Sequence, residues 1–347
     1  MRAYRMIAWK APAEYQEVPV PEPGPGQVLV KVGAAGLCHS DLHVLHEFEE
    51  GMMNGSPPFT LGHENAGWVE ALGAGARGVE VGEPVAVFGS LGCGLCDHCQ
   101  TGDENLCDRQ AELPGAGWGL GVDGGMAPYM LVDRVRQLVP IGDLSPTFAA
   151  PLTDAAVTPY RAIRRSLDSL GPGSTAMVIG VGGLGHIALQ LLRALSPATV
   201  IAVDAKPEAL LLATEMGADH ALLAGATNTT EVMDLTGGRG VDVVLDIVGS
   251  GATLQFALDV ARTGGRVMII GIAGGAVPFS FFAAKPEVQV STSMWGGIGD
   301  LRGVIALAQR GLLTPKITTY DFEEIPEALH ALETGVVEGR AVILPNG

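Results

Sequence analysis

The chain has 347 residues, more than one hydrophobic core usually supports, so two domains are expected. Hydrophobic residues make up 47% of it and charged residues 17%, which is a globular composition and excludes extended disorder. The formal net charge is −17, and no cluster of Lys or Arg interrupts the acidic background. Such a chain would repel phosphate backbones and anionic lipids, so neither nucleic acid nor a membrane is expected as a partner.

The sequence has no segment typical of export or membrane insertion. Residues 1–10 hold no apolar stretch of the kind a secretion signal needs. The uncharged stretch 267–284 contains three glycines and Pro278, which favour a buried strand followed by a loop. We therefore expect a cytoplasmic protein, in which five cysteines serve metal binding or catalysis rather than disulfides.

The first 150 residues predict a mostly β module with long loops. Apolar runs at 28–32, 67–72 and 84–88 are short, are separated by Gly and Pro, and show little helical periodicity. This part also contains the run GCGLCDHCQTGDENLC, in which Cys93, Cys96 and Cys99 are spaced by two residues and Cys107 follows. The spacing predicts a closed tetrahedral Cys₄ zinc site, which holds structure because it leaves no open position for a substrate. The alternative is four incidental free thiols.

The pattern changes near Pro151, after which apolar runs alternate with helical stretches. Continuous apolar runs predict strands buried on both faces, and their alternation with helices predicts a parallel, doubly wound sheet of the Rossmann type. The predicted strands are 176–181, 199–203, 242–247, 266–271 and 288–294, and the predicted helices are 184–195, 208–216 and 253–261. Two further helices at 301–309 and 326–333 and a strand at 340–344 should finish the sheet and return to the first module.

A glycine-rich turn joins the first of these strands to its helix. It contains Gly180-x-Gly182-x-x-Gly185, with Gly183 and Leu184 inside, and this is the fingerprint of a dinucleotide-binding turn. Asp204 ends the next predicted strand, where a carboxylate binds ribose hydroxyls and repels a 2′-phosphate. The turn therefore favours NAD over NADP. The alternative is an ordinary strand–helix turn followed by an acidic strand end.

Four further residues suit a metal but cannot be assembled from their spacing. Cys38 lies in AAGLCHSDLH, His63 and Glu64 lie in LGHENAG, and Asp154 lies in PLTDAAVTPY. Taken singly, such residues are more often packed or solvated than bound to metal.

The chain resembles the medium-chain zinc-dependent alcohol dehydrogenases over essentially its full length. The motifs that carry the resemblance are GLCHSDLH (36–43), LGHENAG (61–67), the cysteine-rich loop (93–107), and VGGLGH (181–186) with Asp204 downstream. The resemblance implies an α/β fold, with a Rossmann NAD-binding domain (155–295) and a mostly β, GroES-like catalytic domain (1–154 and 296–347). It also implies NAD and two zinc ions per chain, one catalytic and one structural.

The catalytic zinc ligands implied by the resemblance are Cys38, His63 and Asp154. Asp154 departs from the best-known members, which have Cys there, but a carboxylate is an acceptable zinc ligand. The PLTDAAVTPY context is closer to that of bacterial secondary-alcohol dehydrogenases. Glu64 is expected either to hold the metal in some states or to support the ligands, and Asp41 to orient the ligand histidine.

The resemblance also assigns a proton path, cofactor contacts and a pocket residue. Ser40 and His43 correspond to the relay that takes the alcohol proton to solvent, although Ser40 also reads as the N-cap of a helix beginning SDLHVL. His39, Thr158, Val248, Ile272 and Arg340 are expected along the cofactor, with Arg340 near the pyrophosphate. Trp295 corresponds to the pocket-lining region, and the alternative for it is a core position.

The expected activity is interconversion of secondary and some primary alcohols with ketones or aldehydes, by hydride transfer to and from NAD. An open zinc position supports it by lowering the pKa of a bound alcohol, as it does that of water. A polyol, aryl or primary alcohol dehydrogenase of the same family is the nearest alternative. A catalytically inactive binding protein is the alternative from another class. The expected partners are a small alcohol or carbonyl substrate and further copies of the chain, as a homodimer or homotetramer.

Overall fold

The computed structural model describes residues 1–225 and 229–347, which form two compact units. Unit 1 comprises Met1–Val157, Gly296–Arg310 and Pro315–Gly347, and unit 2 comprises Thr158–Trp295 and Gly311–Thr314. The sequence had assigned 311–314 to the first domain. Gln190 explains their place in unit 2, because its side chain accepts the N–H of Thr314 at 2.7 Å and donates to the Thr314 carbonyl at 3.2 Å.

Unit 1 is built on a seven-stranded sheet with the order β10-β6-β5-β3-β18-β17, and β9 also pairs with β3. Its central pair, β3 and β5, is antiparallel, and β18 joins the far end of β3. A three-stranded sheet (β2-β1-β4) and the pair β7-β8 complete its strands. The strands are β1 (Arg2–Met6), β2 (Glu14–Glu17), β3 (Val28–Gly36), β4 (Phe59–Thr60), β5 (Glu64–Leu72), β6 (Pro84–Val87), β7 (Gly117–Trp118), β8 (Gly121–Val122), β9 (Tyr129–Val132), β10 (Leu138–Pro140), β17 (Ile317–Asp321) and β18 (Arg340–Leu344).

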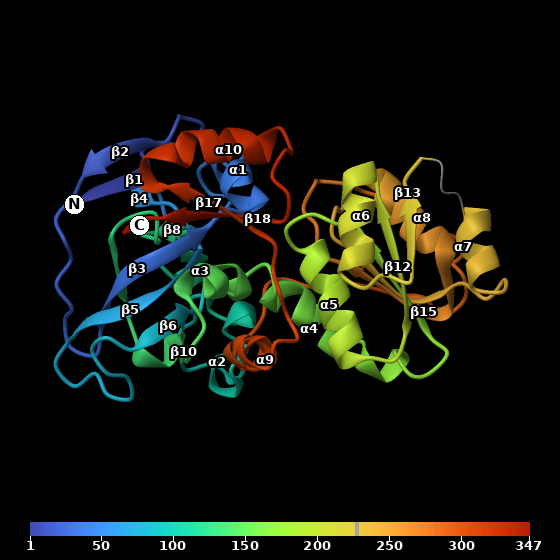
Figure 1. Ribbon diagram of the computed structural model, residues 1–347, viewed down its shortest axis with the longest axis horizontal. Coiled ribbons are helices and arrows are strands. Elements are labelled where there is room, and N and C mark those ends of the chain that lie inside the picture. Colours follow the sequence, from blue (N-terminus) through green and yellow to red (C-terminus); the bar gives the residue numbers. More distant parts are fainter. Residues whose placement is uncertain (226–228) are drawn as a thin grey trace. The chain divides into compact units, whose positions relative to one another are not determined.

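The helices of unit 1 are mostly short. In Figure 1, α10 lies over β17 and β18 and beside α1. The core beneath them is formed by Val28, Val30 and Val32 of β3 together with Ile325 and Leu329 of α10, all of them buried. The helices are α1 (His39–His46), α2 (Asp97–Thr101), α3 (Pro146–Ala149), α9 (Ile298–Gln309) and α10 (Ile325–Glu333), with the 3₁₀ turns η1 (Glu104–Leu106), η2 (Gln110–Glu112), η3 (Val135–Gln137), η4 (Ala150–Thr153) and η6 (Phe322–Glu324).

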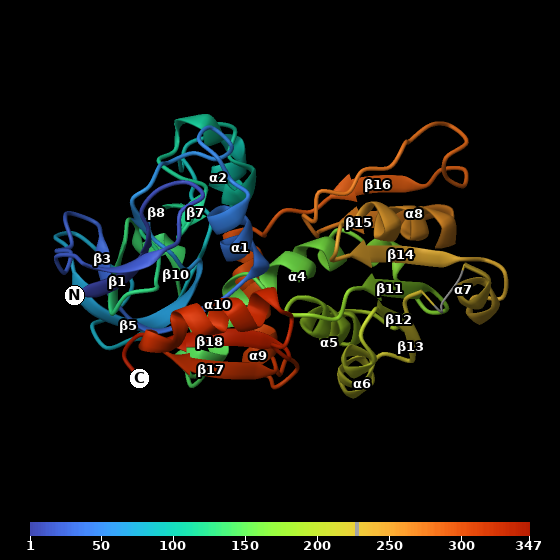
Figure 2. The same ribbon diagram turned by 90° about the horizontal axis from the view of Figure 1, so that it is seen from above.

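Unit 2 is a doubly wound α/β fold. Its six strands have the order β13-β12-β11-β14-β15-β16 and are all parallel, as in dinucleotide-binding domains. Helices α5 and α6 cover one face, and α7 and α8 lie on the other (Figures 1 and 2). The elements are α4 (Val157–Arg164), η5 (Leu167–Ser169), β11 (Thr175–Ile179), α5 (Gly185–Leu195), β12 (Thr199–Asp204), α6 (Pro207–Glu215), β13 (His220–Leu223), α7 (Thr229–Leu235), β14 (Val241–Asp246), α8 (Gly251–Val260), β15 (Ala261–Ile269) and β16 (Gln289–Thr292).

The C-terminal elements divide between the two units. Strand β16 is the last strand of the parallel sheet. Strand β18 pairs with β3 in unit 1, so the chain returns to the first module as expected. The uncharged stretch 267–284 ends β15 and continues without regular secondary structure. Among the described residues, no helix is both long enough and apolar enough to cross a membrane.

Candidate active site and metal centres

Three loops of unit 1 bring four metal-ligating side chains together. Cys38 is the N-cap of α1, directly after β3; His63 precedes β5, which begins at Glu64; and Asp154 follows η4. One ligand atom from each of the four residues lies within 4.8 Å of the others, and all four residues are buried. The Asp154 carboxylate is 3.6 Å from the Cys38 sulfur and 3.7 Å from His63 Nε2.

Asp41 organises the start of α1 and faces His63. Its carboxylate is fully buried, accepts the Cys38 N–H at 2.9 Å and lies 3.3 Å from His63 Nδ1. The helix therefore begins at Cys38, and Ser40 lies inside its first turn rather than at the N-cap. Burial lowers the pKa of His63, but the Asp41 and Asp154 carboxylates outweigh it and leave that pKa well above its ordinary value. The surroundings of the imidazole are thus strongly anionic.

Glu64 and Arg340 form a buried ion pair at the edge of this cluster. Arg340 donates through Nε to Glu64 at 3.0 Å and through a second nitrogen to the other carboxylate oxygen. Its Nη2 is also 3.6 Å from Asp154. Burial raises the pKa of Glu64 to about 8 against the opposing effect of Arg340. Gly36 makes room for this carboxylate, because a Cβ there would lie 2.0 Å from Glu64 Oε2.

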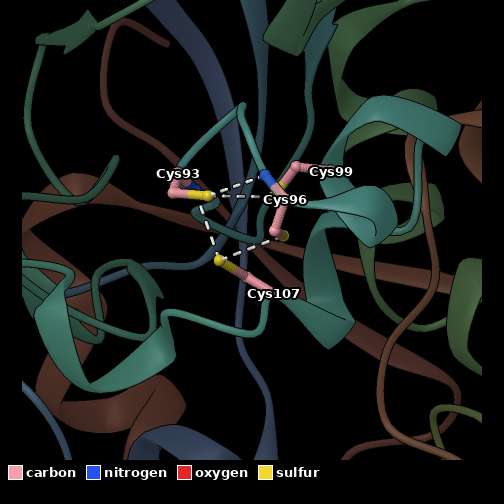
Figure 3. Close-up of side chains that lie close together, drawn as sticks. All are labelled: Cys93, Cys96, Cys99 and Cys107. Atoms are coloured by element: carbon pink, nitrogen blue, oxygen red, sulfur yellow. Dashed lines mark hydrogen bonds between the residues drawn. The ribbon is translucent and has the colours of Figure 1, made fainter.

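The four cysteines of the 93–107 loop converge on one point, as Figure 3 shows. The sulfur–sulfur distances are 3.9 Å for Cys93–Cys99 and 3.9 Å for Cys96–Cys107. These distances are far longer than a disulfide bond of about 2.05 Å. They match the edge of a tetrahedron with zinc–sulfur bonds of about 2.3 Å, which is about 3.8 Å. Backbone N–H groups of Leu95 and Cys96 lower the pKa of the Cys93 thiol to about 6, which favours the thiolate that a metal binds.

Both clusters fit zinc by the chemistry of their donors. The Cys₄ set offers four sulfurs in a closed arrangement, and the buried set offers sulfur, imidazole nitrogen and carboxylate oxygen. A metal would bind the ionised forms of Cys38 and Asp154, which together carry more negative charge than the Arg340 guanidinium offsets beside Glu64. A divalent cation would neutralise that buried negative charge.

The glycine turn of unit 2 has the shape of a phosphate cradle. Gly180 has φ of 92°, and Gly185 allows α5 to approach, because a Cβ there would lie 1.9 Å from the Gly180 carbonyl oxygen. A Cβ on Gly182 would meet nothing within 4 Å, so space is open in front of the helix N-terminus. Asp204 accepts the Val181 N–H at 2.7 Å through one oxygen and the Lys206 N–H at 2.9 Å through the other.

The remaining predicted residues are distributed over the two units. In unit 1, His39 and His43 lie on α1, and His43 Nδ1 is 2.9 Å from Glu47. Ser40 Oγ is 3.6 Å from the Cys38 sulfur. In unit 2, Thr158 is buried, Val248 and Ile272 are exposed at the carboxyl end of the sheet, and Gly183 and Leu184 complete the glycine turn. Trp295 is half-buried with a positive φ of 49°, an uncommon conformation for a bulky residue.

One residue that the sequence analysis did not single out is Asp246, at the end of β14. Its side chain is fully buried and accepts the N–H groups of Val248 and Gly249 at 3.0 and 2.9 Å. It therefore fixes the turn that carries Val248, whose side chain reaches the position a Cβ on Gly180 would occupy. An acidic residue closing an apolar strand, as in VDVVLD, was the available signal.

Comparisons with known proteins agree with this arrangement. The alcohol dehydrogenase GroES-like domain matches residues 24–143, and the zinc-binding dehydrogenase domain matches residues 183–310. An NAD-dependent alcohol dehydrogenase of Sulfurisphaera tokodaii is 37% identical over 99% of this chain and 100% of that protein. The crystal structure of an alcohol dehydrogenase from Aeropyrum pernix superimposes with a TM-score of 0.91 at 36% identity, covering 99% of this chain and 100% of that one.

A third relative is an acetophenone reductase from Geotrichum candidum, whose structure was determined in complex with NAD. It has a TM-score of 0.85 at 31% identity and covers 99% of this chain and 96% of its own. With zinc-type donor sets in one unit and a dinucleotide turn in the other, the chain belongs to the medium-chain zinc-dependent alcohol dehydrogenase family.

Proposed function

We propose that this protein oxidises secondary alcohols to ketones, and reduces ketones in reverse, with NAD as the hydride carrier and one catalytic and one structural zinc ion per chain. The chain is an NAD-dependent oxidoreductase of the alcohol dehydrogenase type, since relatives with that activity match it over its full length. The observation that carries the proposal is the buried set of Cys38, His63 and Asp154 beside Asp41.

The proposed division of labour follows the two predicted domains. The catalytic domain, 1–154 with 296–347, would hold both metals, and 155–295 would hold NAD. Cys38, His63 and Asp154 would bind the catalytic zinc, which when bound supplies a Lewis acid that acidifies an alcohol and polarises a carbonyl. Asp41 would keep the His63 ring oriented, with Nε2 toward Asp154. Glu64 is close enough to serve as an alternate ligand, at the cost of its bond to Arg340.

Two side chains on α1 are proposed to move the proton. Ser40 lies next to the metal set, and His43 lies almost one turn further along the helix. His43 Nδ1 faces the Glu47 carboxylate as a donor, which leaves His43 Nε2 for the exchange of protons. His39, Thr158, Val248, Ile272 and Arg340 are proposed to contact or position NAD, although the Arg340 side chain is committed to Glu64 in this structure.

The preference for NAD is proposed from Asp204. Its carboxylate ends β12 beside the glycine turn, where ribose hydroxyls would bind and a 2′-phosphate would be repelled. No arginine is adjacent to it in the sequence, although Lys206 lies two residues on.

The preference for secondary alcohols is supported by Asp154 in its PLTDAAVTPY context and by the likeness to an acetophenone reductase. Trp295 is proposed to line the larger of two substrate pockets. A polyol or primary-alcohol dehydrogenase remains the alternative within the family. The preserved donor set argues against an inactive binding protein, because a protein without chemistry has no need of a thiolate, an imidazole and a carboxylate buried together.

A kinetic panel tests the proposed substrate class. Ethanol, 2-butanol, 1-phenylethanol and a polyol would be compared with both NAD and NADP. We expect kcat/KM with NAD to be at least about tenfold higher for the secondary alcohols than for ethanol, since each additional buried methylene is worth about 0.8 kcal/mol. Equal values for ethanol and 2-butanol would return the choice to a general primary-alcohol dehydrogenase. No turnover of any alcohol would favour the binding protein.

Metal analysis of undialysed protein tests the proposed zinc count. A ratio near two zinc ions per chain is expected. Cys99→Ser should lower the melting temperature more than it lowers kcat, because the Cys₄ site holds structure. A fully active enzyme with zinc only in the Cys₄ site would contradict the catalytic set.

We further propose a cytoplasmic homodimer or homotetramer. None of the five cysteines forms a disulfide, which supports a reducing compartment. Light scattering of the purified protein distinguishes these assemblies from a monomer.

A further inference from the structure

Two arginines from one short segment lie against the four-cysteine site. Arg134 precedes η3 and Arg136 lies within it, well apart in sequence from the cysteines. Together with Gly92, Cys93, Gly94 and Glu104 they line a cavity beside the metal ligands. The chemistry of the structural metal uses neither arginine as a ligand, so their position needs another explanation.

Arg136 holds the loop between the third and fourth cysteines. Its Nη2 donates to the Cys99 carbonyl at 3.1 Å and also to the carboxylate of Glu104. Glu104 begins η1, which ends just before Cys107, and only 7% of its surface is exposed. Gly92 permits this close packing, because a Cβ there would lie 2.9 Å from both the Cys99 sulfur and Glu104 Cβ.

Arg134 covers the turn between the first two cysteines. A Cβ on Gly94 would lie 2.2 Å from Arg134 Nη1, so the guanidinium rests directly on this turn. Within the described part of the chain, the Arg134 guanidinium has no carboxylate within ion-pairing distance. The two acids that line the same cavity have other partners, because Glu104 pairs with Arg136 and Asp133 accepts a hydrogen bond from Gln27.

A loaded Cys₄ site needs positive charge nearby. Four thiolates around one Zn²⁺ leave a formal charge of about −2. The rest of the protein makes this negative charge more unfavourable, because its net charge is −17 and it has few cationic side chains. Guanidinium groups within a few ångströms lower the energy of such an anionic site, and because both arginines are exposed the effect of each is modest.

We propose that Arg134 and Arg136 form an arginine brace that retains the zinc ion of the Cys₄ site, with Arg136 held in position by Glu104. The brace acts by stabilising the charged, metal-loaded loop, and it has no part in hydride transfer. This inference rests on the structural zinc in the proposed function.

Zinc release followed together with thiol exposure tests the brace. A colorimetric chelator reports zinc, and Ellman's reagent counts thiols. Because the chain has five cysteines, loss of the Cys₄ zinc exposes four thiols, whereas loss of the other proposed zinc exposes only Cys38. The two sites are thereby separated in the intact holoenzyme without any measurement of activity.

The variants are chosen to separate charge from shape. Arg136→Gln should release the four-thiol zinc about tenfold faster than the parent, as is usual when a residue that supports metal ligands is lost. Both arginines are exposed, but only Arg136 holds the loop by the hydrogen bonds to Cys99 and Glu104, so Arg134→Gln should release the zinc only about threefold faster. Arg136→Lys should fall between the parent and Arg136→Gln, because lysine keeps the charge but loses the planar, two-pronged donor geometry of the guanidinium. Arg109→Gln is the matched control, since it removes an exposed arginine two residues from Cys107 but outside the cavity.

Three outcomes decide the matter. Faster four-thiol release in Arg134→Gln and Arg136→Gln than in Arg109→Gln supports the brace. Equal rates in all three overturn it while leaving the two-zinc proposal intact, and a parent with no four-thiol zinc overturns both. A merely structural ion pair would lower the melting temperature equally in holo and metal-depleted protein, whereas the brace lowers it mainly in the holo form.

Discussion

At the residue scale, Asp154 is the most unusual member of the proposed catalytic set. One of its oxygens is near the Cys38 sulfur, His63 Nε2 and the Arg340 guanidinium at the same time. A thiolate at this position would also bind zinc but would form a weaker hydrogen bond with an arginine. The aspartate thus joins the metal set to the Arg340–Glu64 pair.

Replacement of this carboxylate should remove the catalytic metal. Asp154→Ala is expected to lower zinc from two ions per chain to one and to reduce kcat/KM by a factor of about 100 or more, since the acidity of the bound alcohol depends on the metal. Asp154→Cys should restore the zinc. Metal analysis and steady-state kinetics check both, and Asp143→Ala, at an exposed acid of the same unit, should behave like the parent.

Asp204 accepts a backbone N–H of the glycine turn, and its charge is proposed to favour NAD over NADP. Asp204→Asn tests the role of the charge. The amide oxygen keeps an acceptor for the Val181 N–H, whereas the Lys206 N–H loses its acceptor, so the glycine turn keeps its bond while the charge is lost. We expect kcat/KM with NAD to fall about tenfold, because hydrogen bonds to charged groups contribute about 1.5–3 kcal/mol. The value with NADP should rise. An unchanged ratio of the two values would show that the carboxylate does not discriminate between the cofactors.

At the element scale, the turn between β11 and α5 contains one glycine that is needed for packing and another that is expected to matter only for NAD binding. Gly185→Ala places a methyl group against the Gly180 carbonyl, so it should lower the melting temperature by several degrees. Gly182→Ala meets open space within the chain, so it should leave the melting temperature near that of the parent. It should instead weaken NAD binding about tenfold, because the methyl group occupies the place of the pyrophosphate.

Calorimetry and NAD titration check this pair. Gly185→Ala is expected to change the melting temperature, and Gly182→Ala the affinity for NAD. A stable Gly182→Ala variant that binds NAD like the parent would show that the dinucleotide binds elsewhere.

At the amino-terminal end of the same parallel strands, Asp242 lies at the start of the central strand β14. Its buried carboxylate accepts the Thr175 N–H at 2.8 Å and pairs with Arg239 and Arg262. Burial raises its pKa, but these three donors outweigh burial and hold the pKa below its ordinary value. The carboxylate therefore contributes stability above the unfolded-state pKa of about 3.9, and this contribution is lost as the pH falls through the lower folded value.

Asp242→Asn should cost about 2 kcal/mol at pH 7, within the range for hydrogen bonds to a charged group, because Asp242 is buried but Arg239 and Arg262 are partly exposed. The difference from the parent should shrink below pH 4. Asp168→Asn is the matched control, because Asp168 pairs with Arg266 at the surface and should cost less than about 1 kcal/mol. Urea unfolding at several pH values measures both. A difference that stays constant down to pH 3 would argue against a charge effect.

The elements that the sequence predicted best are those whose burial is uniform along the strand. Strands β11 and β14 are buried at every residue, so they appear as continuous apolar runs. Strand β13, with only four half-buried residues, and the short helix α7 gave no such signal and were missed. The start of α1 was also hidden, because its N-cap is a cysteine and the stabilising carboxylate is Asp41.

At the scale of the whole molecule, the candidate site depends on pairings that no local pattern encodes. Glu64 and Arg340 are 276 residues apart, and Cys38 and Asp154 are 116 apart. The proposed ligand set could be put forward from the sequence only because the motifs resemble those of a known family. The arginines beside the cysteine loop lie outside every such motif, so their position became apparent only in the structure.

The far C-terminal strand should be needed for one unit and dispensable for the other. A chain ending at Gly339 lacks Arg340 and the β18 partner of β3, whereas the parallel sheet of unit 2 loses no strand. We expect this truncated chain to lose the catalytic zinc and to bind NAD about tenfold more weakly, a cost of about 1.4 kcal/mol, because Arg340 is one of the proposed NAD contacts. Metal analysis and NAD titration measure the two quantities. Loss of both would show that unit 2 depends on unit 1 for its stability.

Unit 1 is formed by segments from both ends of the chain, and this has a consequence for the protein during its synthesis. By the time unit 2 has been translated, β3 has most of its neighbours but still lacks β18. An unpaired strand edge is a template for association with other chains. The nascent protein therefore carries an open edge and an unpaired buried glutamate for about 185 residues of elongation after Asp154, roughly 10–40 seconds at typical rates of synthesis. Variants of the 340–344 segment should therefore increase aggregation of the new chain, and its dependence on chaperones, more than variants of the metal-binding residues do.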